Sequence, residues 1–203
     1  MNRGKNLWLV LGLAVAIAAG LGWMRFSSPS LPAGNLAGAS LGGPFALVDQ
    51  NGRTVRDTDF AGRYRLIYFG YSFCPDICPT DLAQLGRGLA SFQAQDAARA
   101  AKVAPIFITI DPARDTPAML KPFVAAFHPR LVGLTGTSAQ IAAVTKAYGV
   151  YAKRVDTGDA ENYLMDHSAM VYLYGPEGQP IAYLDHKGLT AELITRMLAT
   201  YVR

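Results

Sequence analysis

Residues 65–82 read RLIYFGYSFCPDICPTDL, and this stretch decides the interpretation of the 203-residue chain. Residues 65–71 form a continuous apolar and aromatic run, which is typical of a strand buried in the middle of a sheet. The only two cysteines in the chain, Cys74 and Cys78, follow at once, and each precedes a proline. A helix is expected over about 80–92. Cysteines between a central strand and a helix N-terminus lie where the helix dipole favours a thiolate.

Strand and helix signals alternate over the rest of the chain. A hairpin is expected at 45–55, because Asn51-Gly52 is a turn signal between two short strand-like runs. Further strands are expected at 103–110, 168–174 and 181–185, and further helices at 117–127, 138–148 and 190–201. This order predicts an α/β, thioredoxin-like fold with an extra N-terminal β-hairpin.

Residues 7–23 contain no charged side chain and are long enough to cross a bilayer. Arg3 and Lys5 precede this run, and positive charge favours the cytoplasmic side of a membrane. The pattern predicts one transmembrane helix in a bacterial inner membrane, with the N-terminus in the cytoplasm and everything after Arg25 in the periplasm. A cleaved signal peptide is the alternative, although the apolar part of most signal peptides is shorter than this run.

The sequence therefore predicts three parts: a membrane anchor (1–26), a flexible linker (27–44) and one folded domain (45–203). The linker is assigned because it is rich in small residues, Gly and Pro. Three of the 19 lysines and arginines flank the anchor, which leaves 16 against 15 aspartates and glutamates. No basic run with interleaved aromatic residues is present. This near-neutral balance gives no support for nucleic-acid binding.

Four roles are open to Cys74 and Cys78. A structural disulfide across three residues would close a very small loop and so add little stability. A thioredoxin-type oxidoreductase has two residues between its cysteines and a cis-proline before a later strand, but here the spacing is three and residues 130–175 contain no proline. A thiol peroxidase usually carries a threonine three residues before the reactive cysteine, where this chain has Tyr71 or Pro75. The fourth role is a metal site with a third ligand from elsewhere.

The third ligand would come from one of three histidines. His128, at the end of a helix, and His186, in a polar turn, are expected to be solvated surface residues. His167 lies where the missing cis-proline would face the cysteines, so it is favoured as the ligand. Structural zinc usually takes four protein ligands, and iron–sulfur clusters usually take four thiolates. Copper is the best remaining candidate for two thiolates and one imidazole.

Three motifs together closely resemble the Sco/SenC family of copper-binding assembly proteins. They are YFGYSFCPDICPTDL (68–82), TIDPARDTP (109–117) and MDHSAMVYL (165–173). The resemblance covers nearly the whole domain and includes the membrane anchor. It implies a membrane-tethered, thioredoxin-like domain that binds Cu(I) or Cu(II) through Cys74, Cys78 and His167.

The resemblance also implies a function. Family members are metallochaperones rather than enzymes, and they help to assemble the binuclear copper site in subunit II of cytochrome c oxidase. The expected partners are that subunit, a copper donor and a periplasmic thiol reductant that keeps the two cysteines reduced. The alternative is a membrane-anchored thiol–disulfide reductase that keeps the target's copper-ligand cysteines reduced. Such a reductase would need Cys74 and Cys78 but not His167.

The motifs contain further residues with expected physical roles. Asp166 is expected to orient His167, since metal-binding histidines usually have a hydrogen-bonded partner, or to form part of a docking surface. Asp111 and Asp115 are expected either to stabilise a turn and helix start or to contact a partner. Met165 is expected to be a packed strand residue, with a weak extra ligand as the alternative.

Overall fold

The computed structural model describes residues 34–156, 158 and 163–203. The anchor predicted at 1–26 lies outside these residues. None of the helices within the described ranges combines the length and apolarity needed to cross a bilayer. The described residues, from Gly34 onward, belong to one compact unit.

The centre of the fold is the parallel pair β4 (Tyr64–Gly70) and β5 (Val103–Thr109), both buried along their whole length. They belong to an eight-stranded sheet of order β1-β10-β9-β4-β5-β6-β2-β3. On the β4 side follow β9 (Met170–Tyr174), β10 (Pro180–Asp185) and the edge strand β1 (Gly34–Asn35), and on the β5 side β6 (Val132–Thr135) comes first. The predicted central strand and its neighbours are therefore confirmed. β6 and the short β1 had no clear sequence signal.

The predicted N-terminal hairpin is present as β2 (Ala46–Asp49) and β3 (Thr54–Arg56), which pair in antiparallel fashion. Its turn contains Gly52 at φ +80°, a conformation that glycine adopts without steric cost. β2 also pairs with β6, so the hairpin extends one edge of the sheet. A 3₁₀ helix, η1 (Asp57–Phe60), leads from the hairpin to β4.

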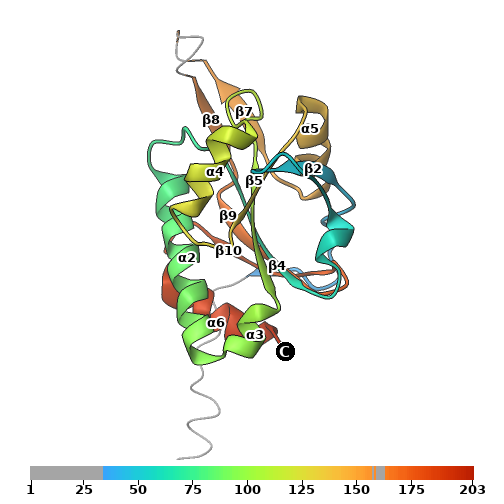
Figure 1. The fold of residues 1–203 in the computed structure, drawn as a ribbon, viewed down its shortest axis with the longest axis vertical. Helices are drawn as coiled ribbons and strands as arrows, with labels where there is room; N and C mark the ends of the chain where they lie inside the picture. The colour runs from blue at the N-terminus through green and yellow to red at the C-terminus, as the bar shows by residue number, and fades with distance from the viewer. Residues whose placement is uncertain (1–33, 157, 159–162) are drawn as a thin grey trace, which may run out of the picture. The chain divides into compact units, whose positions relative to one another are not determined.

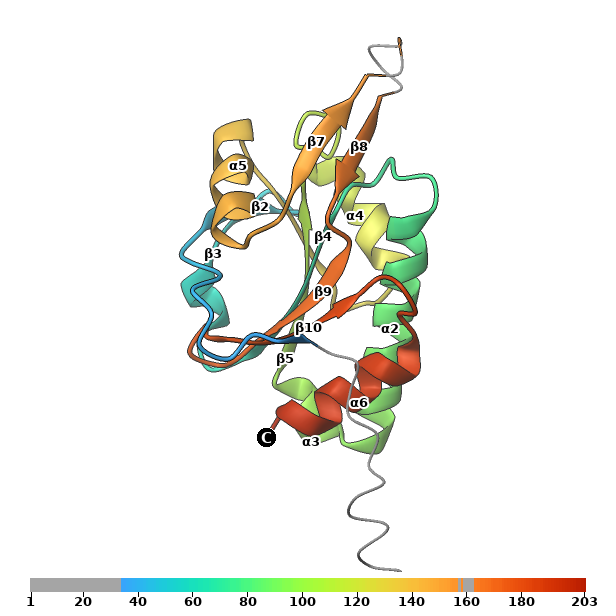
Figure 2. The same cartoon turned by 180° about the vertical axis from the view of Figure 1, so that it is seen from behind.

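Helices cover both faces of the sheet. Neighbouring side chains of β4 point to opposite faces, so each set contacts a different helix. The hydroxyl of Tyr68 donates a hydrogen bond to Asp81 of α2, whereas the ring of Phe69 lies 5.5 Å from that of Tyr148, which ends α5. Figures 1 and 2 show α2, α4 and α6 on one side and α5 on the other. The helices are α2 (Ile77–Gln95), α3 (Ala97–Ala101), α4 (Pro117–Ala125), α5 (Ser138–Ala147) and α6 (Ala191–Tyr201). This layering confirms the thioredoxin-like α/β fold.

A separate two-stranded sheet, β7 (Ala152–Val155) and β8 (Leu164–His167), was not expected. Its side chains are mostly exposed or half-buried, so the sequence contains no apolar run to indicate it. Figure 2 shows this hairpin projecting from one end of the main sheet. His167 is the last residue of β8 and pairs with Ala152, so the hairpin delivers this histidine to the end of the sheet where β4 stops.

Candidate metal centre

The cysteine loop is built around the start of α2, which begins at Ile77, three residues earlier than expected. The first N–H groups of a helix have no partner within the helix. The Sγ of Cys74 accepts a hydrogen bond from the N–H of Cys78 at 3.4 Å, whereas the N-cap residue Asp76 provides no side-chain acceptor. The sulfur of Cys74 thus makes the hydrogen bond that a capping side chain usually makes, and it satisfies the N–H of Cys78 in the first turn of the helix. This leaves Cys74 half-buried and Cys78 fully buried.

His167 completes a compact group of three donor atoms. Its Nε2 lies 3.4 Å from the Sγ of Cys78, and the ligand atoms of Cys74, Cys78 and His167 all lie within 4.8 Å of one another. The Nδ1 of His167 is 3.1 Å from the carbonyl oxygen of Ser168. Because a carbonyl only accepts hydrogen bonds, Nδ1 carries a proton, and Nε2 is the ring nitrogen that faces the sulfurs. The predicted proximity is confirmed, and the role of these residues as metal ligands remains a prediction.

The two thiols differ sharply in acidity. A hydrogen bond from the Cys78 side chain lowers the pKa of Cys74 to about 3, with a smaller lowering from His167. The same hydrogen bond and burial raise the pKa of Cys78. The metal-free pair therefore consists of one thiolate and one thiol at neutral pH. A thiolate, a second sulfur and an imidazole nitrogen form a soft donor set that fits Cu(I).

The loop after β5 fixes the start of the cysteine loop through Asp115. This carboxylate is fully buried and accepts hydrogen bonds from the backbone N–H of Ser72 (3.0 Å), the hydroxyl of Ser72 and the hydroxyl of Thr109 (2.5 Å). Burial raises the pKa of Asp115. Ser72 precedes Cys74 by two residues, so Asp115 ties the cysteine loop to the end of β5.

The same loop also holds the hairpin that carries His167. The Nε of Arg114 lies 2.6 Å from the Oδ2 of Asp111, and its Nη1 donates to the carbonyl oxygen of Tyr163 at 2.9 Å. The Tyr163 hydroxyl donates to Asp111 at 2.7 Å, and the Arg114 guanidinium lies 3.6 Å from the centre of the Tyr163 ring. Tyr163 directly precedes β8. The expected loop-stabilising role of Asp111 and Asp115 is thus confirmed, and both side chains are buried rather than exposed to a partner.

The surroundings of His167 differ from the expectation in one respect. Within the described residues no hydrogen bond joins Asp166 to His167, and Asp166 is exposed, so the expected orienting role of Asp166 is not seen. The ring is held instead by the Ser168 carbonyl and by the edge-on ring of Tyr71, whose centroid is 5.9 Å away. The Tyr71 hydroxyl also accepts from the backbone N–H of Met165. Met165 packs against the core, as expected for a strand residue.

Two buried polar residues beneath Cys78 were not predicted from the sequence. Tyr68 donates a hydrogen bond to the Oδ2 of Asp81 at 3.1 Å. Burial raises the pKa of Asp81, and burial together with the nearby Cys78 and Asp81 raises the pKa of Tyr68. The available signal was an acidic residue one helical turn after Cys78, on the face that the helix turns towards the sheet.

The candidate metal centre opens to solvent through a cavity of about 220 Å³ between the cysteine loop and β8. Its lining includes Cys74 and His167, so an incoming group can reach both. Two exposed apolar side chains, Ile77 and Leu164, belong to this lining. The site is accessible at one side and closed by the core at the other.

The remaining two histidines lie outside this cluster. His186 is half-buried. His128, expected to be solvated, is only 8% exposed. The expectation was wrong because the chain after α4 folds back against α2 and covers the imidazole ring.

Comparison with known proteins finds one family model and several similar proteins. A family model described as SCO1/SenC matches residues 33–203. Protein SCO2, mitochondrial, of Saccharomyces cerevisiae is 41% identical over 80% of this chain, which spans 54% of that protein, about half of its length. The SCO2-like protein of Rickettsia prowazekii is 36% identical, with 88% of this chain and 86% of that protein covered. The structure of Bradyrhizobium japonicum ScoI with copper bound is 43% identical, with 80% and 99% of the two chains covered and a TM-score of 0.71.

Proposed function

Because this chain belongs to the SCO1/SenC family, we propose that it is a copper metallochaperone that carries one copper ion as cargo. The Sγ atoms of Cys74 and Cys78 and the Nε2 of His167 hold the ion. The observation that carries this proposal is the meeting of these three donor atoms within 4.8 Å, although they come from a loop, a helix and a hairpin. The copper bound to the Bradyrhizobium japonicum relative supports the choice of metal.

Transfer proceeds by ligand exchange. Two sulfurs and one imidazole leave copper with few ligands, and the cavity beside Cys74 and His167 admits a thiolate or imidazole of the acceptor. The acceptor is subunit II of cytochrome c oxidase, as the family resemblance implies. A separate donor supplies the copper. The domain works in the periplasm, held at the bacterial inner membrane by residues 7–23, and a thiol reductant there returns any Cys74–Cys78 disulfide to the metal-binding form.

The asymmetry of the two thiols favours a second candidate, a thiol–disulfide reductase. The half-buried Cys74 thiolate would attack a target disulfide, form a mixed disulfide and release one target thiolate. Cys78 would then lose its proton and attack the sulfur of Cys74, which releases the second target thiolate. The target gains two electrons, and the chain is left with a Cys74–Cys78 disulfide that the external reductant must reduce.

Copper binding is tested by titrating Cu(I) against a competing chelator, with the reduced full-length protein kept anaerobic in detergent. We expect one tight equivalent for the wild type and an affinity loss of about 100-fold or more for His167→Ala, because a ligand is removed. His186→Ala is the matched control and keeps wild-type affinity. Equal affinity of His167→Ala and the wild type would remove His167 from the ligand set.

The reductase is tested with the oxidised copper-binding domain of subunit II as substrate, counting the thiols that appear in it. A reductase loses this activity in Cys74→Ala and Cys78→Ala but keeps it in His167→Ala. A chaperone without this activity reduces no disulfide in any of the four proteins. The two assays together therefore separate the functions.

A further inference from the structure

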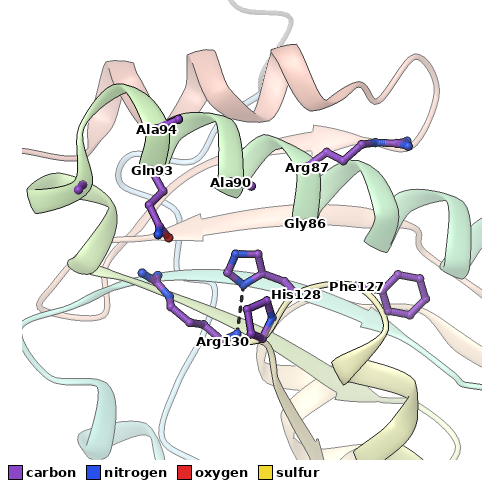
Figure 3. Close-up of a pocket in the computed structure, with 10 residues that line it drawn as sticks. Gly86, Arg87, Ala90, Gln93, Ala94, Phe127, His128 and Arg130 are labelled. Carbon is purple, nitrogen blue, oxygen red and sulfur yellow. Dashed lines mark hydrogen bonds between the residues drawn. The ribbon is translucent and has the colours of Figure 1, made fainter.

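A second cavity, of about 630 Å³, lies between α2 and the loop at 127–130. Its lining shares no residue with the cavity of the metal centre. Figure 3 shows α2 above it, with Gln93, His128 and Arg130 among its lining side chains. The volume falls in the range of about 300–1,000 Å³ that is typical of small-molecule sites.

The cavity has a rigid frame because α2 and the loop touch at Gly86. A Cβ atom at Gly86 would lie 2.3 Å from the carbonyl oxygen of Phe127. Only glycine allows this close approach of helix and loop. Ala90, Ala94 and Phe127 supply apolar walls beside the contact.

The imidazole of His128 is a hydrogen-bond donor on the cavity. Its Nδ1 accepts from the backbone N–H of Arg130 at 3.1 Å, drawn as the dashed line in Figure 3. Burial and the nearby Arg130 lower the pKa of His128, so the ring is neutral at neutral pH. A neutral ring that accepts at Nδ1 carries its proton on Nε2. Within the described part of the chain, no acceptor is hydrogen-bonded to this Nε2–H.

Positive charge accumulates here without a counter-charge. Arg63 and Arg130 both donate to the carbonyl oxygen of Val103, at 3.3 and 2.5 Å. The lining contains Arg87 and Arg130 but no aspartate or glutamate. Among the described residues, none of Arg63, Arg87 and Arg130 forms an ion pair, and the buried Nε of Arg130 has no acceptor. The unpaired Nε–H of Arg130, the Nε2–H of the buried His128 and the charges of Arg87 and Arg130 together favour an anionic ligand.

We propose that this cavity binds an organic monocarboxylate. The carboxylate accepts hydrogen bonds from the His128 Nε2–H, the Gln93 amide and the Arg130 guanidinium. The apolar body of the ligand packs against Ala90, Ala94 and Phe127. A carboxylate with a short apolar chain matches both parts of the lining, whereas a cation would be repelled by Arg87 and Arg130.

The test uses the full-length protein and three probes, hexanoate, acetate and hexan-1-ol. Each is titrated while the imidazole signals of the three histidines are followed by NMR. We expect hexanoate to shift the His128 signals in a saturable way and to leave those of His167 and His186 in place. Acetate lacks the four methylene groups of hexanoate and should bind about tenfold more weakly. Full burial of four methylene groups would give a larger difference, but they are only partly buried in this half-open cavity. Equal saturable binding of hexan-1-ol, or no saturable shift with hexanoate, would overturn the proposal.

Two variants locate the site. Arg130→Gln should weaken hexanoate binding at least about tenfold, because a charge-assisted hydrogen bond is lost. Gln93→Glu puts a carboxylate into the cavity, so it should abolish hexanoate binding and raise the melting temperature by about 2–4 °C. Arg53→Gln, an exposed arginine elsewhere, is the control. Wild-type hexanoate affinity in Gln93→Glu would contradict the site, and unchanged Cu(I) affinity in that variant shows that its metal centre is intact.

Discussion

The Nε2 atom of His167 lies 3.4 Å from the Sγ of Cys78, although 89 residues separate the two in the chain. Cys78 belongs to the first turn of α2, packed on the main sheet, whereas His167 ends a hairpin outside that sheet. Their meeting therefore depends on what positions the hairpin. Arg114 positions the hairpin, because it bonds both to Asp111, in the loop after β5, and to Tyr163, which directly precedes β8.

Replacing Arg114 by alanine should destabilise the protein and loosen the metal centre. The change leaves the carboxylate of Asp111 buried without its cation, and breaking a buried pair costs about 3–5 kcal/mol. It also frees Tyr163, so we expect Cu(I) affinity to fall about tenfold, as it does when outer partners of a metal ligand are lost. Denaturant unfolding and Cu(I) competition measure the two effects.

Arg154→Ala is the matched control for this prediction. The Arg154 guanidinium also lies over the Tyr163 ring, at 3.9 Å, but its side chain is 47% exposed. Its removal should cost less than about 1 kcal/mol and leave Cu(I) affinity unchanged. If Arg114→Ala bound copper as tightly as Arg154→Ala, the hairpin would not depend on Arg114.

The acidity of Cys74 gives a second prediction. Because its pKa is lowered to about 3, Cys74 stays a thiolate throughout the neutral range. Its alkylation by iodoacetamide should change little between about pH 5 and pH 8, whereas an ordinary thiol of pKa about 8.5 gains roughly tenfold per pH unit. Mass spectrometry of the metal-free, reduced protein measures this rate for each cysteine, and we expect the buried Cys78 to react last.

Two variants identify the cause of this acidity. The hydrogen bond from Cys78 contributes more to the lowered pKa of Cys74 than the one from His167. Cys78→Ala should therefore move the alkylation midpoint to higher pH further than His167→Ala does. The reverse order, or a wild-type midpoint near pH 9, would show that the thiol pair does not share its proton in this way.

The main sheet could be predicted from the sequence because its central strands are buried on both faces. Such strands read as continuous apolar runs, as in residues 65–71 and 103–110. The β7–β8 hairpin could not be predicted in this way, since few of its side chains are buried. The start of α2 was missed for a different reason. The N–H of Cys78, in its first turn, is satisfied by the Cys74 sulfur, which is not among the usual capping side chains.

The group of three candidate ligands was predicted more completely than the residues that support it. The grouping of Cys74, Cys78 and His167 followed from their residue types and from their place in the expected fold. Arg114 and Tyr163 were missed because their contact joins segments 49 residues apart, and no local pattern records such a pair. The burial of His128 was missed because it depends on how α2 and the following loop pack.

Asp81 gives a prediction about the pH dependence of stability. Burial raises its pKa in the folded protein above the ordinary value of 3.8. Its contribution to stability is therefore fully present below about pH 4 and is lost as the pH rises through the folded pKa. Asparagine at position 81 still accepts the Tyr68 hydrogen bond but does not ionise. The free energy of unfolding of Asp81→Asn relative to the wild type should thus increase between about pH 4 and pH 7.

The measurement is urea unfolding of both proteins at several pH values. Asp96→Asn serves as the control, because Asp96 is more exposed and lies at the far end of α2. A relative stability of Asp81→Asn that stays constant or falls as the pH rises would mean that the Asp81 carboxylate is well solvated or paired in the folded protein.

Gly70, the last residue of β4, lies against the Cys78 sulfur. A Cβ atom at this position would be 2.9 Å from the Sγ of Cys78 and 2.8 Å from the Tyr68 ring. Both neighbours are fully buried, so neither can move away freely. We expect Gly70→Ala to cost about 1–3 kcal/mol through overpacking. Because the displaced sulfur is a proposed ligand, Cu(I) affinity should fall about tenfold or more.

Gly43→Ala tests whether this effect is specific to position 70. A Cβ atom at Gly43 would lie 3.7 Å from the Ala147 side chain, an ordinary contact distance. That variant should keep the wild-type Cu(I) affinity and lose little stability. The two variants are compared by Cu(I) competition and by denaturant unfolding. If Gly70→Ala were destabilised yet bound Cu(I) with wild-type affinity, the position of the Cys78 sulfur would not limit copper binding, and Cys78 would be a weaker candidate as a ligand than Cys74 and His167.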